Sequence, residues 1–167
     1  YVKKYEEETN LRCQILLDIS SSMYFPENSE NKLNFSALCA ASLIYLLKSQ
    51  RDAFGLTTFS DKIYFHADAK LNENNRNNIY AQLEHLLNQK PKSQITNAKE
   101  SIHAFAEMIH RRSLVVIFSD MFDNIGDANS MQDLIDALQH LKYNKHEVVL
   151  FHVIDKRHEI DFEYENR

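Results

Sequence analysis

The stretch Ile15-Leu16-Leu17-Asp18-Ile19-Ser20-Ser21-Ser22 decides the fold, because an apolar run ends in an Asp-x-Ser-x-Ser cluster. Apolar residues alternate from Leu11 to Leu17 along one face, which predicts a strand that becomes buried just before Asp18. One carboxylate and two hydroxyls, from Asp18, Ser20 and Ser22, then converge where that strand ends. Oxygen ligands of this kind suit a hard divalent cation, although short Asp and Ser side chains also satisfy the amides of turns.

The rest of the chain alternates between the periodicities of helices and strands. Strand patterns with a two-residue spacer, Ser60-Asp61, predict an antiparallel hairpin, and Asn34 is expected to cap the first helix. The helix after Pro91 is expected to open at Thr96-Asn97, with Glu100 completing a capping box. We expect helices over residues 37–47, 79–87, 102–109 and 131–141, and strands over residues 11–17, 53–59, 62–65, 114–118 and 148–154.

The order of these elements predicts an α/β fold. Continuous apolar strands such as Leu114 to Phe118 need cover on both faces, and strands alternating with helices favour right-handed parallel crossovers. We therefore expect a doubly wound, mostly parallel sheet with helices on both faces and one antiparallel edge strand.

Composition indicates one globular domain spanning residues 1–167, with residues 1–10 as a leading strand or linker. The chain has 44% hydrophobic residues and a net charge of -5, so nucleic acid is a poor candidate ligand. No run approaches the length of a membrane span, which predicts no membrane contact. Cys13 and Cys39 fall in apolar segments and are expected to be reduced. The start at Tyr1 and the charged end suggest a piece of a longer protein.

The predicted fold brings a second carboxylate to the first. Open α/β sheets bind ligands beyond the carboxyl ends of their strands, and Asp120 follows the strand that ends at Phe118. If the two strands are neighbours, Asp18 and Asp120 share one crevice, where like charges repel unless a cation lies between them. Thr96 is either a further hydroxyl ligand or only the cap of its helix.

Most enzyme classes lack their required residues. Dinucleotide-binding and Walker-type loops need glycine-rich turns, but the chain has two glycines, Gly55 and Gly126. A Gly-x-Ser-x-Gly elbow is absent from the sequence, which argues against a serine hydrolase. A Mg²⁺-dependent phosphoester hydrolase using Asp18 as nucleophile stays an alternative, although Ser20 stands where a general-acid carboxylate is expected.

The pattern Asp18-x-Ser20-x-Ser22, then Thr96-Asn97, then Asp120 resembles the metal-ion-dependent adhesion site of von Willebrand factor type A domains. The segments 2–8, 114–120 and 146–155 resemble a bacterial branch, domain-of-unknown-function family 58, whose members often accompany MoxR-type AAA ATPases. The resemblance implies a von Willebrand A, Rossmann-like fold in a bacterial cytoplasmic protein. One departure is that Ser93-Gln94-Ile95 stand where many relatives have glycines before the threonine.

The resemblance also implies a metal site and a role. Its metal shell is Asp18, Ser20, Ser22, Thr96 and Asp120, holding Mg²⁺, or alternatively Mn²⁺ or Ca²⁺. A protein partner, with a MoxR-type AAA ATPase as the candidate, supplies an acidic side chain that completes the coordination. The expected function is therefore a non-enzymatic, metal-dependent protein-binding module. The alternatives are the hydrolase and a metal-free scaffold domain.

Overall fold

The computed structural model describes residues 11–27, 30–89, 98–110, 112–121 and 128–161. Within these ranges five strands form one sheet in the order β3-β2-β1-β4-β5. Only the β2–β3 pair is antiparallel, and the other neighbours run parallel. The strands are β1 (Arg12–Asp18), β2 (Ala53–Phe59), β3 (Ile63–Lys70), β4 (Leu114–Ser119) and β5 (Glu147–His152). The expected doubly wound α/β fold with one antiparallel edge is confirmed, while residues 1–10 lie outside the described ranges.

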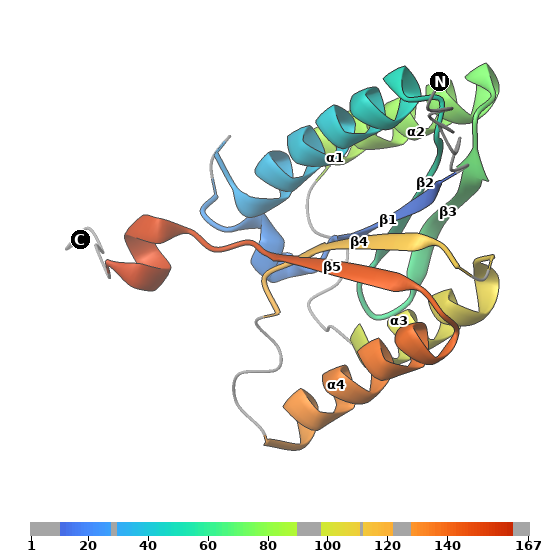
Figure 1. Ribbon diagram of the computed structural model, residues 1–167. Helices are drawn as coiled ribbons and strands as arrows, with labels where there is room; N and C mark the ends of the chain where they lie inside the picture. The colour runs from blue at the N-terminus through green and yellow to red at the C-terminus, as the bar shows by residue number, and fades with distance from the viewer. Residues whose placement is uncertain (1–10, 28–29, 90–97, 111, 122–127, 162–167) are drawn as a thin grey trace, which may run out of the picture.

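Helices cover both faces of the sheet (Figure 1). One pair lies on one face, α1 (Lys32–Ser49) with α2 (Glu73–Leu87), and α3 (Ala98–Met108) with α4 (Ala128–Tyr143) lies on the other. Two short turns flank the carboxyl ends of the parallel strands. They are the 3₁₀ turn η1 (Ser21–Tyr24) and the one-turn π-helix η3 (Lys156–Ile160).

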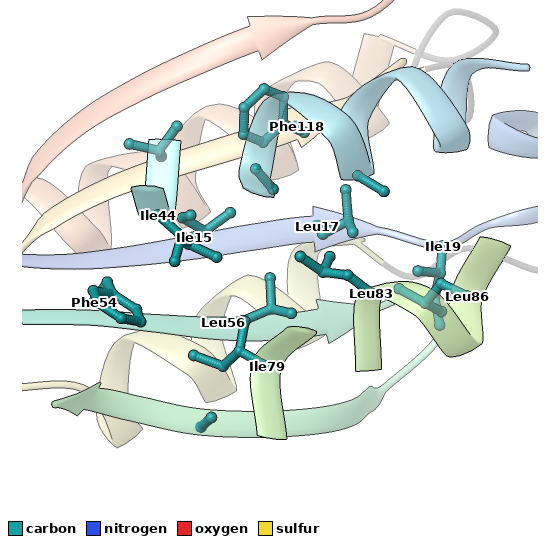
Figure 2. Close-up of a cluster of buried hydrophobic side chains, with 14 of the residues drawn as sticks. Ile15, Leu17, Ile19, Ile44, Phe54, Leu56, Ile79, Leu83, Leu86 and Phe118 are labelled. Atoms are coloured by element: carbon teal, nitrogen blue, oxygen red, sulfur yellow. The ribbon is translucent and has the colours of Figure 1, made fainter. Parts of the chain in front are cut away.

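The alternation of β1 explains why the sheet has two cores. Ile15 and Leu17 point to the face covered by α1 and α2, where Figure 2 shows them among apolar side chains of β2 and both helices. Leu16 belongs to the core on the opposite face, with Ile102 and Phe105 of α3. Each fully buried side chain of this size contributes about 1.5–3 kcal/mol. The sheet therefore stays central because β1 is apolar on both sides.

The structure corrects the expected start of the first helix. The cap of α1 is Asn31, whose side chain accepts the backbone N–H of Asn34 at 2.8 Å. Asn34, the expected cap, lies inside the first turn, so Lys32 becomes the first helical residue. That shift of three residues brings Lys32 to the carboxyl edge of the sheet.

Other boundaries differ by a few residues. β3 runs to Lys70, five residues beyond the expected strand, because it keeps pairing with β2 as far as Phe54. β5 ends at His152 rather than at residue 154. Ile135, expected on the apolar face of α4, is 39% exposed, because Leu134 and Ala137 form the buried side of that helix.

The register of the sheet positions the candidate site. Leu17 of β1 pairs with Phe118 of β4, so Asp18 and Ser119 follow at the same level on neighbouring strands. β1 connects through α1 to β2 on one side, whereas β4 lies on the other side. The crevice between β1 and β4 is thus the switch point at which open α/β sheets bind ligands.

Candidate functional site

Asp18 is the centre of the polar cluster at the carboxyl edge. Its Oδ1 accepts the backbone N–H of Ser20 at 2.8 Å, and its Oδ2 accepts the hydroxyl of Ser119 at 2.5 Å. The Asp18 and Ser119 side chains are almost completely buried. Both donors are neutral groups, so they orient the carboxylate without supplying a compensating positive charge.

The two predicted serine ligands lie together beside this carboxylate. The hydroxyl oxygens of Ser20 and Ser22 are 3.1 Å apart. Ser20 precedes the η1 turn, yet its side chain makes no capping hydrogen bond to that turn. The turn-capping alternative therefore holds for Asp18, which accepts a turn amide, and fails for the Ser20 hydroxyl.

Asp120 reaches the edge from the end of β4 and meets a cation of the chain itself. Its Oδ2 lies 2.8 Å from the ammonium nitrogen of Lys32, and both side chains are 3% exposed. The same ammonium contacts Oε1 of Glu159 at 2.5 Å. Three elements thus meet in one ion network, the start of α1, the end of β4 and the η3 turn, with Lys32 and Asp120 buried and Glu159 19% exposed.

Backbone contacts hold Asp120 at this position. Its carbonyl oxygen lies 2.9 Å from Nε2 of His152, the last residue of β5. Next along the chain, Met121 has a positive φ of 52° and donates its N–H to the Ser119 hydroxyl oxygen at 3.1 Å. Arg51, Arg112 and Lys145 have a positive φ as well and lie away from this edge, so the conformation of Met121 fixes the path of the chain after Asp120 without marking a functional site.

The electrostatics of Asp18 and Lys32 differ. Burial raises the pKa of Asp18 to about 6, its hydrogen bonds from Ser119 and Ser20 act against this, and the charge of Asp120 raises the pKa further. Burial lowers the pKa of Lys32, but hydrogen bonds and charges from Asp120 and Glu159 outweigh it, so the pKa is raised overall. Lys32 therefore stays charged at neutral pH, whereas the Asp18 carboxylate carries poorly compensated charge.

Four of the five predicted metal ligands are described and lie at the same edge. Asp18, Ser20, Ser22 and Asp120 offer carboxylate and hydroxyl oxygens, a donor set that fits Mg²⁺, Mn²⁺ or Ca²⁺. Thr96, the fifth, lies outside the described residues. Across the described part of the chain, no three His, Cys, Asp or Glu side chains gather as a metal cluster. The predicted site has only two carboxylates, and Lys32 competes for one of them.

Sequence reasoning missed three residues that contact the predicted carboxylates or their lysine: Lys32, Ser119 and Glu159. A signal existed for Lys32, because a cation in the first turn of a helix opposes the macrodipole, and α1 has no acidic residue there. Ser119 directly precedes Asp120 in the quoted strand and could have been included on that ground. Glu159 lies 127 residues from Lys32, and no local pattern joins the two.

Comparison with known proteins identifies a family but no curated relative. A family model described as "Protein of unknown function DUF58" matches residues 1–160. No curated protein matches the sequence. Within the described residues, no helix combines the length and apolar character that a membrane crossing requires.

Several solved structures share the fold. An aerotolerance-related membrane protein from Bacteroides fragilis NCTC 9343, solved with multiple mutations to serines, has a TM-score of 0.64 and 17% identity, covering 86% of this chain and 67% of its own. The conserved hypothetical protein BatB from Bacteroides thetaiotaomicron has a TM-score of 0.55 and 17% identity, with coverages of 84% and 65%. Proximal thread matrix protein 1 from the mussel byssus has a TM-score of 0.51 and 16% identity, and the match covers 84% of this chain and 36% of that protein. At these identities the likeness establishes the fold alone.

Proposed function

The chain belongs to the DUF58 family, and from that membership and the polar edge between β1 and β4 we propose that the domain binds a divalent cation there and uses it to bind an acidic protein partner. The observation that carries the proposal is the pair Asp18 and Asp120, buried together with hydroxyl oxygens at the carboxyl ends of neighbouring strands. The resemblance to von Willebrand A domains supports the same reading.

The electrostatics of the edge favour a cation there. The neutral donors that hold Asp18 leave its pKa at about 6, so at neutral pH the carboxylate is ionised against the cost of its burial. A Mg²⁺ ion with few anionic protein ligands would supply positive charge and keep positions open to an incoming carboxylate. Ser119 would orient Asp18 from its far side, as partners of ligating carboxylates do.

Calorimetric titration with Mg²⁺ and Mn²⁺ tests the cation. We expect saturable binding to the wild-type chain and its loss in Asp18→Asn, which keeps the shape of the side chain and removes its charge. Asp136→Asn is the matched control, because Asp136 is an exposed carboxylate on α4 that accepts a hydrogen bond from Gln132. Equal binding by wild type and Asp18→Asn would contradict the proposal.

The partner is a separate part of the proposal. The family resemblance supports a MoxR-type AAA ATPase, a bacterial cytoplasmic setting and a role without catalysis. A pulldown with this ATPase in Mg²⁺ and in EDTA is expected to show stronger capture in Mg²⁺ than in EDTA. Capture that is equal in both buffers would refute the metal-bridged mechanism, and Asp18-dependent hydrolysis of a generic phosphoester would refute the non-enzymatic role.

A metal-free scaffold is the second candidate function, and the Lys32–Asp120 ion pair favours it. The ammonium already neutralises one of the two carboxylates without an external ion. If calorimetry detects no cation binding by wild type or by Lys32→Met, which removes the competing ammonium, the scaffold function is the one that remains.

A further inference from the structure

The ion network at the carboxyl edge contains a feature that metal binding does not explain. Lys32 is 3% exposed, and its ammonium contacts two carboxylates, that of Asp120 at 2.8 Å and that of Glu159 at 2.5 Å. Burying a lysine is unfavourable unless its charge is matched and its hydrogen bonds are made. Asp120 alone matches its charge, so the contact with a second carboxylate from another element calls for its own explanation.

Glu159 is presented to Lys32 by a compact turn. Asp155 accepts the backbone N–H of His158 at 3.0 Å, while Oε2 of Glu159 accepts the backbone N–H of Asp155 at 2.7 Å. This reciprocal arrangement resembles a capping box, except that the carboxylate comes from Glu159, one residue after the one whose N–H Asp155 accepts. The other oxygen of Glu159, Oε1, is thereby aimed at the lysine. One carboxylate both closes the turn and binds the ammonium.

The turn touches the edge at a second point. The ring of His158 meets the ring of Phe25 edge-on, with centroids 5.0 Å apart. Phe25 is in turn joined to the start of α1, because its carbonyl oxygen accepts the backbone N–H of Lys32 at 3.2 Å. Figure 1 shows the turn beyond the carboxyl end of β5, beside the beginning of α1. The segment Asp155–Asp161 therefore sits on the edge as a bound acidic peptide would.

We propose that Lys32, seated on Asp120, is a metal-independent carboxylate-binding site, and that Glu159 is its ligand in cis, occupying the position that an acidic side chain of a partner takes. The proposal deepens the proposed function and rests on it only for the acidic character of the partner. A partner must displace Glu159, so the segment Asp155–Asp161 limits access to the edge. All of its tests are made in EDTA, so they stand or fall independently of cation binding.

Limited trypsin digestion measures how firmly the segment is held, because Lys156 and Arg157 are cleavage sites within it. Glu159→Gln keeps the shape of the side chain and an acceptor for the Asp155 amide but removes the charge that Lys32 binds. We expect cleavage after these residues to become about tenfold faster, since removing the charge that binds the buried Lys32 ammonium shifts the equilibrium toward release of the segment. Asp161→Asn is the control, compared by cleavage after Arg157: it removes one negative charge from the same segment at a 41% exposed side chain, whose carboxylate lies 4.0 Å from the ammonium of Lys156. Cleavage of Glu159→Gln at the wild-type rate would overturn the proposal.

A synthetic peptide spanning residues 155–161, acetylated and amidated at its ends, tests binding in trans. We expect it to shift the amide resonances around Lys32 in the Glu159→Gln protein. The wild-type protein is expected to bind the peptide at least about tenfold more weakly, because Glu159 of the same chain competes for Lys32. The same peptide carrying Gln at position 159 is expected to give no shift.

Two results would overturn the carboxylate site: equal shifts from the Glu and Gln peptides, or equal shifts in the wild-type and Glu159→Gln proteins. The double variant Lys32→Met, Glu159→Gln is expected to lose the response to the peptide. Because that variant can fail to fold, the comparison of the two peptides on the Glu159→Gln protein decides the question by itself.

Discussion

The two ends of the parallel strands bury polar side chains in opposite ways. At the carboxyl end, Asp18, Asp120 and Lys32 bring ionisable groups into the interior. At the amino end, Gln14 donates to the carbonyl of Ala67 at 3.2 Å, and Nδ1 of His146 accepts the N–H of Ser113 at 3.2 Å.

These amino-end contacts satisfy backbone groups, as packing requires, and the Asp52 carboxylate at the same end does so as well, because it accepts the backbone N–H of Leu11 at 3.2 Å. Buried charge at the other end destabilises the fold unless something compensates it, and the clustering of Asp18, Asp120 and Lys32 there supports the proposed binding site.

The largest expected effect breaks the carboxyl-end network. Lys32→Met leaves the buried Asp120 carboxylate without its ammonium, which is expected to lower the free energy of unfolding by about 3–5 kcal/mol. Urea unfolding in EDTA measures the loss. Lys48→Met, on an exposed position of the same helix, is expected to change stability by at most about 0.5 kcal/mol. If the two variants lose the same free energy of unfolding, Lys32 contributes no more than an exposed lysine does, and the contrast between the two ends of the sheet is wrong.

A smaller effect is expected from the pH dependence of Asp18. Its pKa rises from 3.8 to about 6 on folding, so the folded state holds its proton more tightly than the unfolded state. The stability from this group is fully present below pH 3.8 and is lost as pH rises through about 6, a change on the order of 3 kcal/mol. Asp18→Asn is expected to remove that loss. Unfolding free energies of both proteins at pH 4 and pH 7, in EDTA, provide the measurement.

His146 provides the internal comparison for this titration. Burial is the main cause that lowers the pKa of His146 below 6.5, and the charge of His140 lowers it further. Its stability contribution is therefore present above pH 6.5 and is lost as pH falls through the folded pKa, the reverse of the slope at Asp18. Asp18→Asn is expected to change the unfolding free energy between pH 4 and pH 7 by the same amount whether or not the protein also carries His146→Asn. A different amount in the two backgrounds would show that the two ends are coupled.

The smallest of the three effects tests the tight packing of the amino end. A Cβ on Gly55 would overlap Oε1 of Gln14 and the carbonyl oxygen of Ala67. Gly55→Ala is expected to destabilise the protein by about 2 kcal/mol, as other over-packed sites do. Adding Gln14→Ala is expected to recover only part of the loss, because the backbone of Ala67 cannot retract. Full tolerance of Gly55→Ala by chemical denaturation would mean that this end is loosely packed.

Much of the fold could be predicted, because periodicity reports which faces a strand or helix buries. The alternation ending at Leu17 and the run from Leu114 to Phe118 were sufficient to place two parallel strands with cover on both sides. The helix start was predicted less well: Asn31 and Asn34 are equally good caps by residue type, and their dihedral angles decide between them. Of the candidate ligands, Asp18, Ser20, Ser22 and Asp120 were brought to one edge as the fold predicted.

The sequence by itself determined the order of elements, the sheet with its antiparallel edge, and the presence of Asp18 and Asp120 at strand ends, because each depends on short-range periodicity. Only the tertiary structure decided that Lys32 lies on Asp120 and receives Glu159. Those contacts join α1, the end of β4 and η3, so they depend on where the chain packs rather than on any local pattern. Residues so far apart in the sequence pair because the fold removes their charges from water at the same place. In that setting each charge is stabilised by its partner, whatever the local sequence around it favours.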